Sequence, residues 1–556
     1  DTQRCVGRTQ RRRERRRGRA AATNLTVALV SRASISLVAC IALGAATLAG
    51  AAGVIRTGHP GEPDSLDPQI AVAAPALVVD NDLFEGLMTL DARGKPILGV
   101  AERYEISKDG LTWRFYLRPG LVWSDGKAIT SADFLYSFRR LADPATAATG
   151  LSAWIDLIAN GRAVLRGEKP VTDLGVAAPS PRVFEVTLAA PTPYFQTIVA
   201  FPVFAPMPRH VIEQYGRQWT RPGNMVSNGP FVLEDWRPGQ LVRAKRNPNF
   251  REAAKVAVDA VEYRPVADLN TAFRLFQAGE LDAITNFPPE KLEWLRTNMP
   301  KELRLAPSLG STVYVFNHRH PKFQDPRVRR ALSLAIDRNV ITDKIVRSGD
   351  RPTDSLVPAA LLGRTPKTVT SGRGAALAES RRLLAAAGYG PGRPLEVELL
   401  YHTSEEHKNV ALAVAAMWQT VGVKTRLRNA ERQVVEVATR NGEFEIVRAA
   451  WFSPYEDPMG FFSFLRADSA ANASGYKNAV FEAALDRARD ARDADVRLRE
   501  LSQAESIIEN DQAVLPLYEL VSRRLVARRV QGWRDDNRTA LRPARWMSVT
   551  GAPSTP

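Results

Sequence analysis

The chain has 556 residues, of which 45% are hydrophobic and 24% charged, a globular composition long enough for two or three cooperating domains. The formal charge of +16 suggests an acidic partner, but half of it lies in residues 1–33, which hold ten arginines against two acids. The remaining charge is spread over about 500 residues and is too dilute to predict nucleic-acid binding.

The segment from Ile35 to Ala52 is almost wholly small or apolar and ends in small residues, which is typical of a cleaved signal peptide. A retained anchoring helix is the alternative, disfavoured by the glycine and alanine content. Leu37-Val38-Ala39-Cys40 fits a lipoprotein box in which Cys40 would be acylated, but the apolar run continues beyond it. No apolar pair follows Arg16-Arg17, so a twin-arginine signal is not predicted, and a translation start near Val27 would give a signal peptide of ordinary length.

Both cysteines, Cys5 and Cys40, lie in this leader. The rest of the chain therefore has no thiol nucleophile and no disulfide. After the leader, strand-like and helix-like segments alternate irregularly, without a repeat or a low-complexity tract, which predicts a mixed α/β body.

A strand with one buried face is predicted over residues 111–117, where apolar and polar side chains alternate, and a turn follows at Trp123–Gly126. Thr130 and Asp133 then have the spacing of a capping box at the start of a helix. Apolar residues repeat at helical spacing behind this cap.

A second helix is predicted to begin at Asp325-Pro326, with an N-cap acid and a proline in the first turn. Its apolar stripe runs from Val328 to Ile336, and the arginines between are expected on the solvated face. A single long helix is predicted from Asn478 to Glu509, with its apolar residues in the core.

Eleven short motifs follow one another in an order that resembles the periplasmic oligopeptide-binding proteins of bacterial ABC peptide importers. They lie between Ser65 and Arg329, and the resemblance extends over nearly all of the chain after the leader. The motifs are Ser65–Pro68, Asp82–Leu87, Gly99–Glu102, Trp123–Gly126, Asp133-Phe134, Arg140–Pro144, Thr172–Val176, Phe184–Leu188, Asn228-Gly229, Arg246–Pro248 and Arg327–Arg329.

The resemblance implies an α/β fold like that of periplasmic binding proteins, with two lobes and three domains, a hinge, and a ligand cleft between the lobes. It implies a binding protein rather than an enzyme, without a cofactor. The domains that it implies are a leader and signal peptide at 1–53, a discontinuous domain I at 54–84, 209–309 and 522–556, domain II at 85–208, and domain III at 310–521.

In this family the ligand lies extended, pairs through its backbone as an added strand, and places its side chains in hydrated pockets. Two strand segments of this chain match those that flank the ligand, Val72-Ala73-Ala74 and Ala450-Trp451-Phe452. Their backbone rather than their side chains is expected to pair. The alternative for Trp451 is a purely structural place in the core.

A zwitterionic peptide buried between lobes needs a partner for each terminal charge. The resemblance places Arg448 and His407 at positions that meet the peptide carboxylate, and His320 where a cation serves another peptide length. Arg440 matches a further arginine near the pocket. For each of these residues a structural role is the alternative.

The amine end departs from the family pattern, because Pro454 stands where the family has an aspartate. Proline offers neither a charge nor a backbone donor. Glu456 and Asp457 follow and could replace that aspartate only if the loop were re-routed. We therefore expect a changed ligand, with its amine blocked or displaced, or a related small molecule; an amine pocket restored by these acids is the alternative.

Two further positions indicate a remodelled pocket. Gly310 and Phe452 stand where a family member similar to this chain has a pair of cysteines, and Arg432 stands where a tryptophan is expected near the ligand. Together with Arg448, Arg432 would favour acidic peptides.

Enzyme motifs are absent from the sequence, which has no Gly-x-Ser-x-Gly elbow, no Walker loop and no zinc helix. Two close histidine pairs are His318 with His320, on one face of a strand, and His402 with His407. They leave capture of a metal complex or haem by the same fold as an alternative, and a metal-dependent hydrolase as a further one.

The partners that the resemblance implies are an oligopeptide and a membrane permease driven by cytoplasmic ATPases. A periplasmic monomer is expected, with a lipid anchor at Cys40 as an alternative, and no nucleic acid.

Overall fold

The computed structural model describes residues 53–148, 150–364, 372–469 and 471–550. The predicted signal peptide, the lipoprotein box at Cys40 and the internal start near Val27 lie outside these ranges. Among the described residues, no helix has the length and apolar character needed to cross a membrane.

One large mixed sheet runs through the described chain, and β12 and β17 lie at its middle. In spatial order its strands are β15 (Val423–Ala430), β14 (Leu395–His402), β16 (Ile446–Phe452), β12 (Leu303–Phe316), β17 (Val514–Val526), β11 (Ala283–Ile284), β1 (Val54–His59), β10 (Ala260–Pro265), β9 (Leu241–Arg246) and β8 (Phe231–Arg237), with β13 (Arg351–Pro352) paired to β17.

A second, four-stranded antiparallel sheet and two small two-stranded sheets complete the described strands. Their strands are β4 (Ala101–Ile106), β5 (Thr112–Leu117), β7 (Val183–Thr187) and β6 (Val176–Ser180) in the four-stranded sheet, β2 (Met88–Leu90) with β3 (Pro96–Leu98), and β18 (Val530–Gln531) with β19 (Ser548–Val549).

Most of the described α-helices are short, and α17 is the longest of them. In chain order they are α2 (Ala74–Leu83), α3 (Ser131–Ala142), α4 (Gly161–Leu165), α5 (Phe195–Ile198), α6 (Arg209–Tyr215), α7 (Leu269–Gln277), α8 (Leu292–Asn298), α9 (Pro321–Gln324), α10 (Pro326–Leu334), α11 (Arg338–Val340), α12 (Arg373–Ala386), α13 (Glu405–Gln419), α14 (Arg432–Asn441), α15 (Met459–Phe462), α16 (Ala479–Asp490) and α17 (Ala494–Asp511).

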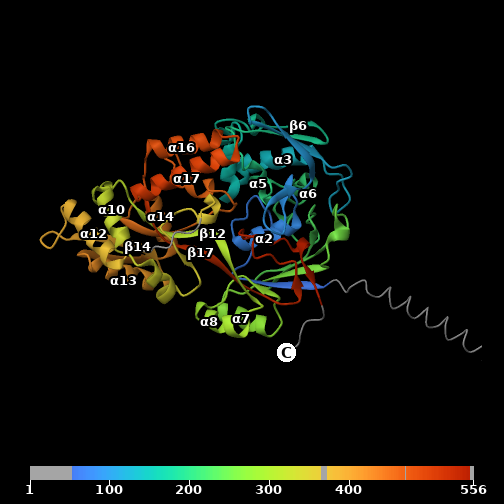
Figure 1. Ribbon diagram of the computed structural model, residues 1–556. Helices are drawn as coiled ribbons and strands as arrows, with labels where there is room; N and C mark the ends of the chain where they lie inside the picture. The colour runs from blue at the N-terminus through green and yellow to red at the C-terminus, as the bar shows by residue number, and fades with distance from the viewer. Residues whose placement is uncertain (1–52, 149, 365–371, 470, 551–556) are drawn as a thin grey trace, which may run out of the picture. The chain divides into compact units, whose positions relative to one another are not determined.

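The buried apolar side chains of the described residues form four clusters. The first lobe has its main core between Ile55 and Ala283 and between Val526 and Met547, joined by Tyr455, and a smaller core between Ala272 and Leu295 with Leu525. The second lobe has two cores, on opposite sides of its part of the sheet, between Val313 and Tyr518. Figure 1 shows β12 and β17 between α12, α13 and α14 of the second lobe and α2 of the first. The predicted boundaries of domains I, II and III stay predictions.

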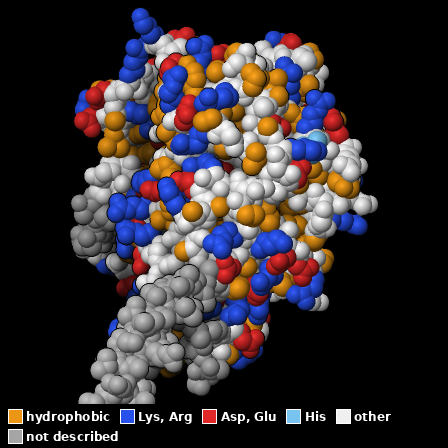
Figure 2. Space-filling model, turned by 90° about the vertical axis from the view of Figure 1, so that its right-hand side faces the viewer, with side chains coloured by type: hydrophobic (Ala, Val, Ile, Leu, Met, Phe, Trp, Pro, Cys, Tyr) orange, Lys and Arg blue, Asp and Glu red, His pale blue; other side chains and the backbone are white. Residues whose placement is uncertain are grey.

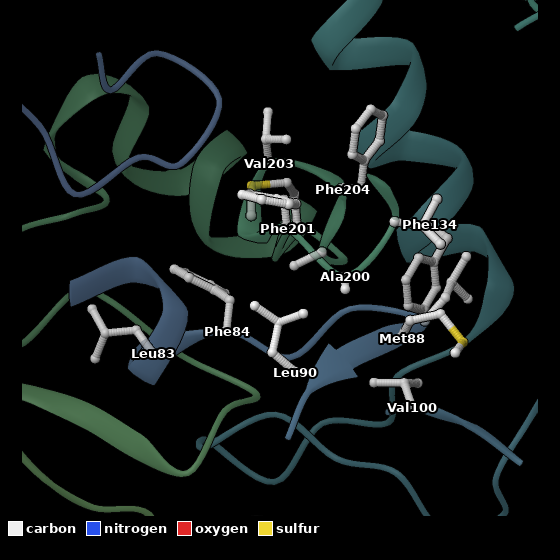
Figure 3. Close-up of a cluster of buried hydrophobic side chains, with 14 of the residues drawn as sticks. Leu83, Phe84, Met88, Leu90, Val100, Phe134, Ala200, Phe201, Val203 and Phe204 are labelled. Carbon is white, nitrogen blue, oxygen red and sulfur yellow. The ribbon is translucent and has the colours of Figure 1, made fainter. Parts of the chain in front are cut away.

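Part of the first-lobe core is built from segments far apart in the sequence (Figure 3). The cluster takes Leu83 and Phe84 from the end of α2, Leu90 from β2, Phe134 from α3, and Phe201. Each of these side chains is at most 3% exposed, so the core anchors α2 through its last turn and thereby sets where the helix lies. That position matters because the Val72–Ala74 segment leads into α2.

The predicted strand and capped helix near residue 120 are confirmed. Strand β5 alternates buried and less buried side chains. Helix α3 begins with a capping box, in which Thr130 accepts from the backbone of the first turn and Asp133 accepts from the Thr130 N–H. The local sequence was enough to predict both elements, because each has apolar residues spaced so that one face is buried.

The helix predicted at Asp325 is also confirmed, with the Asp325 carboxylate accepting from the Arg327 N–H at 2.8 Å. The expected solvated arginine face is wrong for Arg329, which is 5% exposed. Its guanidinium donates to the carbonyls of Phe323, Gln324, Asp511 and Gln512, which joins α10 to the end of α17.

The single helix predicted from Asn478 to Glu509 is wrong. The structure has two helices, α16 and α17, with Ala491 extended between them. Asp493 caps α17 by accepting from the Val496 N–H at 2.8 Å, which stops the first helix and starts the second. The two helices lie side by side (Figure 1), so their apolar faces share one core, which one straight helix would not allow.

Candidate ligand-binding site

One edge of β16 has no neighbouring strand over most of its length. Along its other edge β16 pairs with β12 from Ile446 to Phe452, but β14 pairs with it only at Ile446 and Val447. We call the stretch of β16 from Arg448 to Phe452 the open edge. Within the described residues, no strand covers it.

The hydrogen-bond pattern shows which residues of the open edge are available. The Ser453 N–H donates to the Leu309 carbonyl, and Asn317 N–H donates to Glu445 in the same register. Because bonded pairs alternate in an antiparallel ladder, the N–H and C=O groups of Arg448, Ala450 and Phe452 point away from β12. The predicted strand at Ala450–Phe452 is confirmed, and its backbone can pair with an added strand.

The other predicted strand segment, Val72-Ala73-Ala74, is not a strand. Ala74 is the first residue of α2, and the N–H groups of Val72 and Ala73 donate to the Asp64 carboxylate at 2.9 and 3.0 Å. A proline directly after Ala74 favours this helix start. These two N–H groups are therefore occupied in the structure, although Val72 is 61% exposed.

Arg448 lies half-buried at the start of the open edge. Among the described residues, its guanidinium has no hydrogen bond or ion pair. Its charge acts on His402, at the end of β14, and on His407, in the first turn of α13. Burial first, and then the charge of Arg448, lowers the pKa of His407 to about 4. The pKa of His402 is lowered for the same two reasons.

The two histidines form a perpendicular ring pair with centroids 4.2 Å apart, and His407 Nδ1 lies 3.3 Å from the His402 carbonyl oxygen. At neutral pH both imidazoles are uncharged, so Arg448 is the charged group of this cluster. The sequence paired His402 with His407 for the metal or haem alternative but did not assign it to the peptide site; its place at the end of β14 is the signal that could have done so.

The other cations predicted for the site are Arg432, Arg440 and His320, and of these Arg432 acts on His402. Arg432 begins α14, pairs with Glu436 at 2.8 Å and lies close enough to His402 to lower its pKa. Arg440 is exposed in the last turn of α14. His320 caps α9, and its Nε2 lies 3.4 Å from Glu445, which directly precedes β16. His320 therefore stands at the opposite end of β16 from Phe452.

Beyond the open edge, β16 continues into the Tyr455 loop, which we define as Ser453–Pro458. Pro454 is half-buried. Glu456 pairs with Lys95 at 2.5 Å and with Arg538 at 3.2 Å, both in the first lobe. Asp457 is buried and accepts two hydrogen bonds from Arg497 at 2.8 and 2.9 Å. Both acids therefore already have cationic partners.

Tyr455 joins the end of β16 to the first lobe. Its ring stacks on Tyr194 at 5.2 Å and 9° and meets the edge of Trp154 at 6.0 Å. The Arg497 guanidinium lies 5.7 Å from the centroid of the Tyr194 ring. Tyr455 is 6% exposed and belongs to the first-lobe core although it follows a second-lobe strand. A ligand on the open edge would therefore lie next to a contact between the lobes.

The aromatic side chains of the open edge differ in role. Phe452 is 57% exposed and lies over Gly310, where an added Cβ would come within 2.8 Å of the ring. Gly310 is thus required by the position of Phe452. Trp451 is half-buried and stacks on Phe464 at 5.3 Å, so its side chain packs into the second lobe while its backbone continues the strand.

Among the residues that the structure describes, no group of three or more His, Cys, Asp or Glu side chains could hold an ion. The expectation that His318 and His320 share a strand face is wrong, because β12 ends at Phe316 and His320 caps α9. His318 bonds to the Ala513 carbonyl at 2.8 Å.

Residues 95–473 match the bacterial extracellular solute-binding proteins, family 5 Middle. The chain belongs to this family. It is 37% identical to the periplasmic oligopeptide-binding protein OppA of Salmonella typhimurium, over 85% of this chain and 88% of the relative. It is also 37% identical to the probable deoxycholate-binding periplasmic protein YgiS of Escherichia coli, over 84% and 88%.

Among solved structures, OppA of Haemophilus influenzae in complex with the peptide RPPGFSPFR superimposes with a TM-score of 0.75, at 30% identity, over 90% of this chain and 99% of that one. The predicted family and the α/β fold like that of periplasmic binding proteins are therefore confirmed. Members of family 5 are solute-binding proteins, and that is the function of this chain.

Proposed function

We propose that this chain carries extended oligopeptides, or peptide-like carboxylates, for a bacterial ABC importer. The observation that supports the proposal is the open edge of β16, where Arg448, Ala450 and Phe452 offer backbone donors and acceptors to an added strand. Pairing of this kind is indifferent to side chains, so the edge would accept many sequences, with water filling the remaining pocket space.

Arg448 is the proposed anchor for the ligand carboxylate. A half-buried guanidinium without a counter-ion is costly, and a carboxylate would supply both charge and hydrogen bonds. The same carboxylate would offset the repulsion that lowers the pKa of His407, so His407 would take up a proton more readily in the complex. Arg432 and Arg440 would act as further cations at the rim, whereas His320 would contribute only if Glu445 released it.

The proposed carrier would be periplasmic and monomeric, without enzymatic activity or a cofactor, and would deliver its ligand to a permease driven by ATPases. The relatives named above support this, since their names describe periplasmic binding proteins. The lobes would close about β12 and β17 on a microsecond to millisecond scale. On the face drawn in Figure 2, Lys and Arg are interspersed with Asp and Glu, which gives no support to nucleic-acid binding.

Native mass spectrometry of protein purified without refolding tests the proposal, because a carrier of this kind can retain its cargo. We expect an added mass of a few amino acids. Calorimetric titration with trialanine derivatives, with and without a free carboxylate, then measures the role of the acid end. A protein that carries only a metal complex, or that binds none of these compounds, would contradict the proposal.

A second candidate is an amphiphilic carboxylate such as deoxycholate. It is favoured by the equal identity to YgiS and by the exposed Phe452 ring beside the open edge. Such a ligand would use Arg448 without pairing along β16. The retained mass separates it from a peptide directly.

A further inference from the structure

We infer that the site selects carboxylate ligands whose opposite end carries no positive charge, such as N-acylated peptides. The inference rests on the proposed function, because it assumes a ligand on the open edge of β16. It concerns the residues at the Phe452 end of that edge and what they can offer to a ligand terminus.

The direction of the ligand follows from the position of the unpaired cation. Arg448 lies at the start of the open edge, and Phe452 and the Tyr455 loop lie at its other end. A strand whose carboxylate meets Arg448 therefore runs antiparallel to β16 and brings its amino end to Phe452. That distance is about 13 Å, since four residues of strand rise about 3.3 Å each.

At the Phe452 end, the acids that could neutralise an ammonium group are already engaged. Glu456 uses one carboxylate oxygen for Lys95 and the other for Arg538. Asp457 gives both oxygens to Arg497, and one of them also accepts from the Met459 N–H at 2.9 Å. Freeing either acid would leave a cation without its partner, and for Asp457 this would happen in a buried site.

Two further acids, Asp64 and Glu406, are not placed at this end by any contact among the described residues. The Asp64 carboxylate accepts from the N–H groups of Val72 and Ala73, just before α2. Glu406 lies in the first turn of α13 next to His407, and it acts on Tyr518 together with Arg448. Glu406 therefore belongs to the carboxylate end of the edge.

The surface at the Phe452 end suits an uncharged group instead. Phe452 presents an aromatic ring that is 57% exposed, and Pro454 after it has no N–H and no charge. An acyl group would cover the exposed ring, whereas an ammonium group would lose water there without gaining an acid.

Calorimetric titration with three matched peptides tests the inference: trialanine, N-acetyl-trialanine and N-acetyl-trialanine amide. We expect N-acetyl-trialanine to bind at least tenfold more tightly than trialanine, and the amide to bind weakly. Equal or tighter binding of free-amine trialanine would overturn the inference but leave the proposed function standing. Absence of binding by all three would overturn both.

The variant Pro454→Asp places a carboxylate two residues after Phe452 and should reverse the preference between the acetylated and the free-amine peptide. The affinity for trialanine should rise at least tenfold, and the affinity for N-acetyl-trialanine should not rise. Pro119→Asp is the matched control, because Pro119 is exposed in a turn of the first lobe outside the proposed site. A Pro454→Asp protein that keeps its fold, by circular dichroism, yet leaves the ratio of the two affinities unchanged would contradict the inference.

Discussion

Replacement of Arg448 by methionine tests whether this arginine anchors the ligand or only stabilises the fold. Because its guanidinium has no ion pair or hydrogen bond among the described residues, Arg448→Met should leave the stability of the ligand-free protein unchanged or slightly raised. Methionine keeps most of the apolar stem, so the packing of β16 is preserved.

The loss of binding can be worked from the site. Two charges 4 Å apart attract by about 4 kcal/mol at an effective dielectric constant of about 20, and charge-assisted hydrogen bonds contribute about 1.5 to 3 kcal/mol. Ordering the arginine side chain costs up to about 2 kcal/mol. These terms sum to a net loss of about 3.5 to 5 kcal/mol, which weakens binding of a carboxylate peptide roughly 300- to 4,000-fold.

Calorimetric titration of both proteins with N-acetyl-trialanine and its amide measures this loss. The affinity for the amide should fall little in Arg448→Met, since the amide offers no charge to Arg448. Arg329→Met is the contrasting variant: its guanidinium serves four carbonyls, so we expect about 2 to 4 kcal/mol less stability. If Arg448→Met lowered the melting temperature as Arg329→Met does, and left affinity intact, the reasoning would be refuted.

Three further outcomes are expected from the contacts. Burial raises the pKa of Glu505 to about 7 from 4.5, so ionisation of this carboxyl lowers the stability of the protein as the pH rises through that range. In urea unfolding, Glu505→Gln should therefore raise the free energy of unfolding by about 3 kcal/mol at pH 8 and leave it unchanged at pH 4. Gly310→Ala should lower the free energy of unfolding by about 1 to 3 kcal/mol, because the added methyl would meet the Phe452 ring. Gly374→Ala, which has open space around it, should raise that free energy by up to about 1 kcal/mol, and equal effects of the two variants would contradict this account. Tyr455→Ala should cost about 3 to 5 kcal/mol by removing a buried ring from the first-lobe core, and a loss under about 1 kcal/mol would show that the loop is not held there.

Local patterns in the sequence predicted individual helices and strands, and the order of its motifs predicted the family. The alternation in β5 and the capping box of α3 depend on residues a few positions apart, so the sequence predicted both correctly. The motif order likewise predicted the family and the fold. Arg448 was selected from a matching position in the sequence, and the structure adds that its guanidinium has no partner among the described residues.

Contacts between distant segments were decided only by the tertiary structure. The burial of Arg329 against the Asp511 carbonyl, the pairing of Glu456 with Arg538, and the pairing of Asp457 with Arg497 each depend on where a partner lies after folding. Burial and charge, which determine whether an acid or a cation is free to meet a ligand, are properties of that three-dimensional neighbourhood. The sequence could therefore predict which residues were candidates, but not which of them were already engaged.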